Sequence, residues 1–163
     1  MFARIHCLAL VIACTLLALG CDQNPKAEVS EEFKGQLYQF LREASIFEQM
    51  AGADVLLERK QQQWLSVRVS FGSLLAVWPG RFAPLSQRDF RAAMNSWDLG
   101  LSMESVIRKG GSTKFSFPDG ESRTPTRAEL GAAYAEASGR FTEGRTGILA
   151  DLPHDPFGRR HSG

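Results

Sequence analysis

The stretch that decides the fold is SEEFKGQLYQFLREASIFEQMAG, Ser30–Gly52. Its apolar residues recur every three or four positions, which places them on one face of an α-helix; they are Phe33, Leu37, Phe40, Leu41, Ala44, Phe47 and Ala51. Ser30 is a suitable N-cap, and Glu31 and Glu32 follow it at the positive end of the helix dipole. Gly52 is a suitable stop. We therefore predict an amphipathic helix whose aromatic stripe faces a core.

The segment after this helix carries two competing patterns. In the first, large apolar residues recur every seven positions, which predicts a long helix packed on the first one; they are Leu57, Trp64, Phe71 and Trp78, with Val67 and Leu74 between them. In the second, apolar residues alternate, which favours a strand; they are Leu65, Val67, Val69 and Phe71. We predict a helix, with Asp54 as a candidate cap, to at least Leu65. Residues 66–78 stay open between helix and strand.

Breakers and caps divide the rest of the body. Pro79-Gly80 opens a loop over residues 79–85. A third helix is predicted from Ser86, where Ser86 and Asp89 form a weak capping box, to Ile107. Gly100 is expected to bend or end this helix, and Ser102 can restart it through Ile107. Gly110-Gly111 closes the segment.

A small hairpin and a fourth helix complete the predicted fold. Residues 114–117 alternate polar and aromatic side chains, and residues 118–120 have turn composition. Thr126 and Glu129 form a capping box, and we expect the helix that follows to end at Gly139. The fold class is mostly α: a helical hairpin plus two further helices, with a small β-hairpin. An α+β fold is the alternative.

Composition excludes several classes of protein. The 163 residues contain 44% hydrophobic and 23% charged residues, which suits one packed domain. The formal charge is only +1, so we expect no nucleic-acid partner. The cysteines are Cys7, Cys14 and Cys21, and none follows. The body can therefore hold no disulfide, no cysteine nucleophile and no cysteine-based zinc site.

The N-terminus has the organisation of an export signal. Arg4 precedes an apolar run over residues 7–19, which is shorter than the roughly 20 residues that span a bilayer. Ala18-Leu19-Gly20-Cys21 resembles the lipobox of bacterial lipoproteins, although its first two positions depart from the commonest pattern. This resemblance implies cleavage between Gly20 and Cys21 and attachment of lipid to Cys21.

The lipobox resemblance also implies an address. The mature chain would be held in the bacterial envelope, facing the periplasm, through the acyl chains on Cys21. Asp22 resembles the signal that keeps enteric lipoproteins in the inner membrane, so that membrane is slightly favoured. We divide the chain into a signal peptide (1–20), a lipidated tether (21–29) and a single helical domain (30–163).

The C-terminal segment LPHDPFG, Leu152–Gly158, has a distinctive pattern. Its last four residues fit a type I turn without any function. It also resembles the Pro-x-Asp-Pro-Trp-Gly signature of type II secretion major pseudopilins, with Phe157 replacing the tryptophan. The resemblance implies Asp151 and Asp155 as calcium-ligand candidates. This chain has a lipobox instead of that family's prepilin site and long assembly helix, so we do not expect it to assemble as a pilin.

No catalytic motif stands out in the body. Asp151, His154, Asp155 and His161 fall on a terminal tail, and we predict no metal site and no cofactor. Glu58, Glu104 and Glu129 could act as acids only if they are buried.

Three functions follow as hypotheses. The first is a non-enzymatic, lipid-anchored binding or scaffold protein with an envelope protein partner, for which Trp78 and Phe82 are the first candidates for a contact surface. The second is an inhibitor or immunity-type lipoprotein that neutralises a toxin or hydrolase. The third is a carboxylate-dependent envelope hydrolase. We favour the first and do not expect an enzyme.

Overall fold

The computed structural model describes residues 29–110 and 113–152. They form four helices, α2 (Glu31–Ala51), α3 (Leu57–Ala76), α4 (Pro84–Arg108) and α5 (Arg127–Asp151), and a β-hairpin of β1 (Phe115–Ser116) and β2 (Ser122–Arg123). The chain is therefore mostly α with one small β-hairpin, as the sequence predicts.

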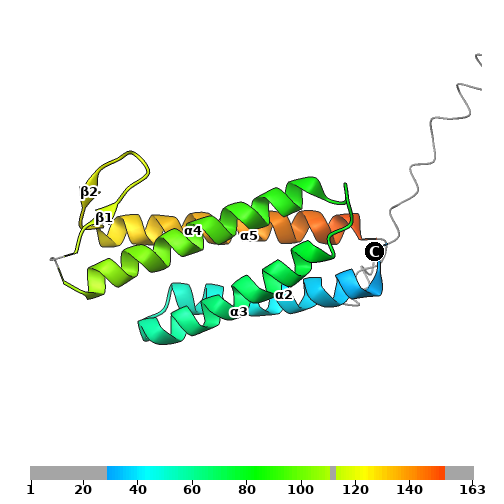
Figure 1. Ribbon diagram of the computed structural model, residues 1–163, viewed down its shortest axis with the longest axis horizontal. Helices are drawn as coiled ribbons and strands as arrows, with labels where there is room; N and C mark the ends of the chain where they lie inside the picture. Colours follow the sequence, from blue (N-terminus) through cyan, green and yellow to red (C-terminus); the bar gives the residue numbers. More distant parts are fainter. Residues whose placement is uncertain (1–28, 111–112, 153–163) are drawn as a thin grey trace, which may run out of the picture.

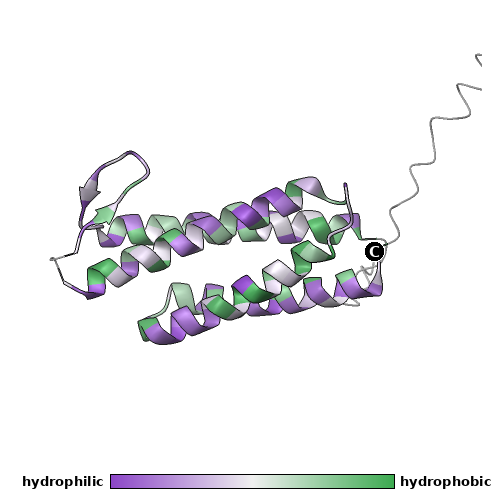
Figure 2. Cartoon of the chain, in the orientation of Figure 1, coloured by the Kyte–Doolittle hydropathy of each residue, from purple (hydrophilic) through white to green (hydrophobic). Residues whose placement is uncertain are grey.

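The helices form two layers, each an antiparallel hairpin (Figure 1). One layer contains α2 and α3, and the other contains α4 and α5. The start of α2, the α3–α4 loop and the end of α5 lie at one end of the bundle. The α2–α3 turn and the β-hairpin lie at the other end (Figure 1). Hydrophobic and hydrophilic bands alternate along the helices, as expected where only one side is buried (Figure 2).

The α2 helix has the predicted ends. The side chain of Ser30 accepts a hydrogen bond from the backbone N–H of Phe33 at 3.1 Å, and Gly52 is the C-cap. Every residue of the predicted apolar stripe is buried. Val29, which the sequence assigned to the tether, is buried as well, so it belongs to the packed body.

The α3 helix resolves the competition between the two patterns. Residues 66–76 are helical, because the seven-residue repeat is the pattern that packs. Leu65 and Val69, which belong to the alternating pattern, are instead 59% and 69% exposed. Asp54 is not the cap, since the helix begins at Leu57 and Leu56 is the N-cap residue.

The start of α4 differs from the prediction. The helix begins at Pro84, and the N-cap residue Ala83 makes no side-chain cap hydrogen bond. The Ser86–Asp89 capping box is therefore wrong. Ser86 is buried and faces Gly147 of α5, where packing uses its side chain.

Gly100 does not end α4. A Cβ atom placed at Gly100 would lie 2.6 Å from Cε1 of Tyr134, so the glycine gives that ring its space on α5. The helix ends at Arg108, and Gly110 adopts a positive φ of 67° just beyond it.

The α5 helix continues for twelve residues beyond Gly139, the predicted end, to Asp151. Tyr134, Phe141 and Ile148 are buried at intervals of seven, so the apolar stripe continues past the glycine. Burial of Phe141 and Ile148 stabilises the extension, against a helix penalty of roughly 1 kcal/mol for each glycine. The predicted capping box of Thr126 and Glu129 is confirmed at the start.

The β-hairpin is confirmed as well. Phe115 pairs with Arg123 and Ser116 with Ser122, and Gly120 in the turn has a φ of 90°. The guanidinium of Arg123 lies 4.1 Å from the ring centre of Phe117.

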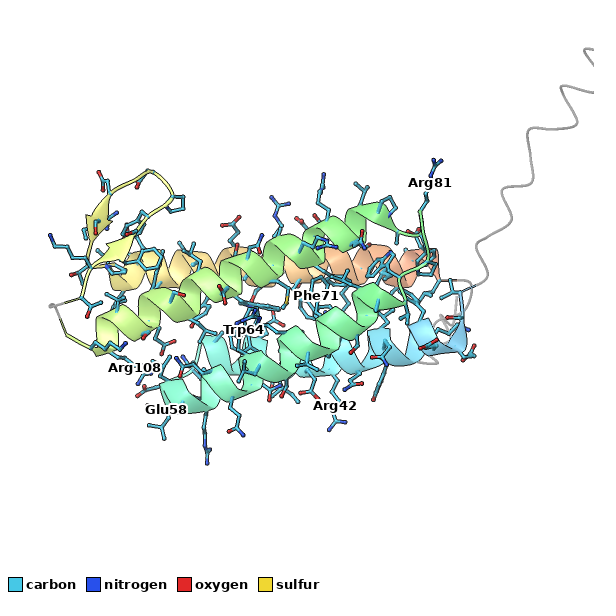
Figure 3. The ribbon with its side chains drawn as sticks, viewed as in Figure 1. Arg42, Glu58, Trp64, Phe71, Arg81 and Arg108 are labelled. Carbon is cyan, nitrogen blue, oxygen red and sulfur yellow. The ribbon has the colours of Figure 1, made fainter. Side chains whose placement is uncertain are left out.

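Aromatic rings fill the space between the two layers. The rings of Phe40 and Phe90 lie 5.1 Å apart, and those of Phe47 and Trp97 lie 5.5 Å apart. Trp64 and Phe71 lie between the layers in Figure 3. Within the second layer, Gly100 of α4 and Gly144 of α5 let these two helices approach each other closely. None of the helices in residues 29–110 and 113–152 is both long and apolar enough to cross a membrane.

Candidate functional site

Four polar side chains from three helices meet near the β-hairpin end of the bundle. They are Lys60 of α3, Glu104 and Arg108 of α4, and Tyr134 of α5. Lys60 is 2% exposed and Glu104 is 4% exposed, so both charges lie within the packed body. Arg108 is exposed at the edge of this group. We call the four residues the buried polar cluster, after the buried Glu104 at its centre.

Glu104 is the centre of the buried polar cluster. Lys60 Nζ lies 3.1 Å from each carboxylate oxygen, and the Tyr134 hydroxyl donates to Oε2 at 2.8 Å. Arg108 donates to Oε1 through Nε at 3.0 Å and through Nη2 at 2.8 Å. Donors from three helices therefore converge on one carboxylate.

Lys60 and Arg108 also donate hydrogen bonds to backbone carbonyls at the α2–α3 turn. Lys60 Nζ donates to the carbonyl of Ala51 at 3.1 Å, and Arg108 Nη2 donates to the carbonyl of Val55 at 2.9 Å. The buried polar cluster thus joins α3, α4 and α5 to the α2–α3 turn. It satisfies one of the carbonyls that the end of α2 leaves without a helical partner.

The donors decide the charge of Glu104. Burial raises the pKa of its carboxyl group, but the hydrogen bonds from Tyr134, Arg108 and Lys60 outweigh burial and hold that pKa below its usual value. Burial and the hydrogen bond to Glu104 raise the pKa of Tyr134. Near neutral pH, Glu104 is therefore ionised and has no proton to donate, and Tyr134 keeps its proton.

Sequence reasoning found only one member of the buried polar cluster, Glu104, as a candidate acid. The signal for three of them is present in the seven-residue repeats. Lys60 shares its register with Val67 and Leu74, Glu104 with Phe90 and Trp97, and Tyr134 with Phe141 and Ile148. A polar residue in a core register predicts burial, and burial of a charge demands a partner.

The three candidate carboxylates have separate surroundings. Glu58 is exposed in the first turn of α3 (Figure 3). Glu129 caps α5 and accepts a hydrogen bond from Arg123 Nη1 at 2.9 Å. The hydrogen bonds from Arg123 and Thr126 lower the pKa of Glu129 to about 2. The structure thus places the buried Glu104 in a different setting from the other two carboxylates.

The α3–α4 loop carries the predicted contact residues. Trp78 and Phe82 are both half-buried, and their rings lie edge-on to Phe33, at 5.3 and 5.7 Å between centres. The indole N–H of Trp78 donates to the carbonyl of Phe82 at 2.7 Å. Arg81 is exposed at the tip of the loop, and Leu85 is 64% exposed just after it. The two aromatic residues therefore serve partly as core, whereas Arg81 and Leu85 are exposed to solvent.

Several predicted site residues lie outside the described residues: Gly20, Cys21, Asp22, His154, Asp155 and His161. Asp151 is exposed as the last residue of α5. Within the described part of the chain, no group of three or more histidine, cysteine, aspartate or glutamate residues could hold a metal ion.

No family model, no curated protein and no solved structure matches this chain.

Proposed function

We propose that this protein is a lipid-anchored component of the bacterial envelope whose helical body acts as a non-enzymatic binding or scaffold module. The observation that carries the proposal is the Gly20-Cys21 junction, which follows a charged start and a short apolar run. Several acyl chains on one cysteine would hold the protein durably, since each buried methylene contributes about 0.8 kcal/mol.

The geometry of the body supports a binding role over a catalytic one. A general acid must carry a transferable proton near the working pH, and a general base must have a carboxylate oxygen free to accept one. Glu104 is the one buried carboxylate among the three candidates, and its donors hold it ionised and occupy both of its oxygens. Its contacts therefore fit a structural role, which favours binding by the outer surface of the body.

The anchor is tested by feeding an alkyne fatty acid to cells that produce the tagged protein. We expect the wild type and Cys14→Ser to incorporate the label, because Cys14 lies within the apolar run rather than at the junction. Cys21→Ser should lose the label. Equal labelling of Cys21→Ser and wild type would exclude lipidation at this residue.

The binding role is tested by crosslinking the tagged protein in cells and identifying what it captures, with Cys21→Ser as the control. A stable envelope partner that is captured only by the anchored form supports a scaffold. Capture of one foreign or secreted enzyme, with protection of cells against that enzyme, would support the inhibitor alternative instead.

A further inference from the structure

The end of the bundle that carries the α3–α4 loop is also the end at which α2 starts (Figure 1). The residues that connect Cys21 to the body therefore join it at this end. We propose that this end rests on the surface of the lipid bilayer, with residues 78–85 against the headgroups. These residues, here called the membrane-side loop, comprise the α3–α4 loop from Trp78 and the first two residues of α4. The inference rests on the proposed lipid anchor and names the lipid surface as the partner of the predicted Trp78–Phe82 contact region.

The first argument is the position at which the N-terminal part of the chain joins the bundle. Val29 is buried, and Phe33, four residues later, packs on Trp78 and Phe82. The chain therefore enters the bundle directly beside the membrane-side loop. Cys21 and Val29 are eight residues apart, so they can be separated by at most about 28 Å. The acyl chains must lie within this reach of the loop end.

The length of the bundle carries the second step. The α5 helix has 25 residues and is therefore about 38 Å long. It runs from the β-hairpin to the end at which α2 starts (Figure 1). When the bundle stands on the membrane-side loop, the β-hairpin and the α2–α3 turn lie farthest from the bilayer. They are then free for a protein partner.

The chemistry of the membrane-side loop carries the third step. Tryptophan, arginine and an exposed aliphatic residue are the groups that contact the headgroup region. Trp78 is half-buried with its N–H already bonded to Phe82, so it can enter a less polar layer without an unpaired donor. Leu85 is exposed in the first turn of α4, and Arg81 points away from the body (Figure 3), where it can bind lipid phosphate.

Charge alone does not orient the bundle. Glu31 and Glu32 lie in the first turn of α2 at the same end, where they offset Arg81. The contact therefore depends on the acyl anchor, on Leu85 and on the amphipathic loop. Arg81 adds a phosphate contact that the orientation does not require.

The competing orientation lays the bundle on the outer side of α3. Leu65 and Val69 are exposed there, one helical turn apart. The exposed residues of α3 include no aromatic side chain, so this side lacks the amphipathic ring that the membrane-side loop provides. We therefore favour the loop end, and the test includes both surfaces.

The body contains no cysteine after Cys21, so one introduced cysteine can carry a fluorophore. We would place it in the full chain by Arg81→Cys, by Val69→Cys and by the matched control Lys114→Cys. Lys114 is also exposed and cationic but lies at the hairpin end. Each purified lipoprotein is incorporated into vesicles of phosphatidylethanolamine and phosphatidylglycerol that contain lipids with brominated acyl chains, which quench only nearby fluorophores.

We expect the label at position 81 to be quenched several-fold more than the labels at positions 69 and 114. Equal quenching at 81 and 114, in protein that floats with the vesicles, would overturn the orientation and leave the anchor intact. Stronger quenching at position 69 than at 81 would show the bundle lying on α3 and would also overturn it. Failure of the unlabelled wild type to float with the vesicles would contradict the anchor, and the orientation would fall with it.

Discussion

At the residue scale, the most informative positions are those where a polar side chain occupies a core register. Lys60, Glu104 and Tyr134 each lie seven residues from a buried apolar residue of the same helix. Together they place a hydrogen-bonded polar group at a level of the core where apolar side chains would otherwise pack. A buried polar residue can fix the register of packed helices at some expense of stability, and we expect that role here.

The first prediction concerns the ion pair between Lys60 and Glu104. Glu104→Met should lower the free energy of unfolding by about 3–5 kcal/mol, because it leaves Lys60 buried without its carboxylate. Lys60→Met should have a smaller effect, since Arg108 and Tyr134 still bind Glu104. Urea unfolding of both variants and of the double variant measures the coupling. The double variant should be more stable than Glu104→Met, and a loss equal to the sum of both single losses would contradict this account.

The second prediction concerns Glu129, whose folded pKa is lowered to about 2 from a usual 4.5. A lowered folded pKa means that the stabilisation is complete above the usual value and is lost as pH falls toward about 2. Glu129→Gln keeps the cap geometry but cannot ionise. The wild type should therefore lose more stability than this variant between pH values of about 5 and 2, measured by urea unfolding. Parallel pH profiles for the two proteins would rule out this contribution.

At the scale of elements, the glycines of α5 fall into two groups: those that a neighbouring helix contacts and those that have open space around them. A Cβ at Gly144 would lie 2.8 Å from two ring carbons of Phe90 and 3.2 Å from the carbonyl oxygen of Ser86. A Cβ at Gly131 or Gly139 would meet no atom within 4 Å. The first glycine is therefore required by the contact between α4 and α5, whereas the other two only weaken the helix.

The third prediction distinguishes the two groups of glycines by alanine substitution. Gly139→Ala and Gly131→Ala should each raise the free energy of unfolding by about 0.8–1 kcal/mol, the usual gain of alanine over glycine in a helix. Gly144→Ala should instead lower it by about 1–3 kcal/mol, through overpacking against α4. Thermal unfolding followed by circular dichroism measures all three. Stabilisation by Gly144→Ala would show that α4 and α5 are farther apart than described.

Local signals predicted the elements well where caps and repeats agreed. Ser30 with Gly52 defined α2, and Thr126 with Glu129 defined the start of α5. The end of α5 was wrong because Gly139 resembles a stop, while packing of Phe141 and Ile148 on the other helices is a tertiary effect. Residues 66–78 could not be decided either, because their alternating pattern is equally visible and only burial shows which repeat packs.

The candidate site was predictable only in part. Glu104 was identified, but its role depends on Lys60 and Tyr134, which lie 44 and 30 residues away in the sequence. Their core registers were visible, yet their convergence required the arrangement of three helices.

At the scale of the whole molecule, packing within a layer differs from packing between the layers. Small residues bring α4 and α5 together within one layer, and large rings fill the space between the layers. Phe40 lies in this aromatic zone, with ring centres 5.0 Å from Phe71, 5.1 Å from Phe90 and 6.1 Å from Phe141. Both helical hairpins should therefore unfold together.

The fourth prediction tests this coupling. Phe40→Ala should lower the free energy of unfolding by about 3–5 kcal/mol, because the ring is fully buried between the layers. Phe117→Ala removes a half-buried ring of the β-hairpin and serves as the control. Urea unfolding by circular dichroism and by tryptophan fluorescence should give coincident transitions in both variants. An equal loss of stability in the two variants would contradict the central role of the aromatic zone.

The central claim is that the mature protein begins at a lipidated Cys21 and carries this bundle at the membrane. Mass spectrometry of the N-terminal peptide from the protein purified out of cell membranes tests it most directly. We predict a peptide that starts at Cys21, with the added mass of acyl chains on that residue. An N-terminal peptide that starts at any other residue, or an unmodified Cys21, would contradict the claim.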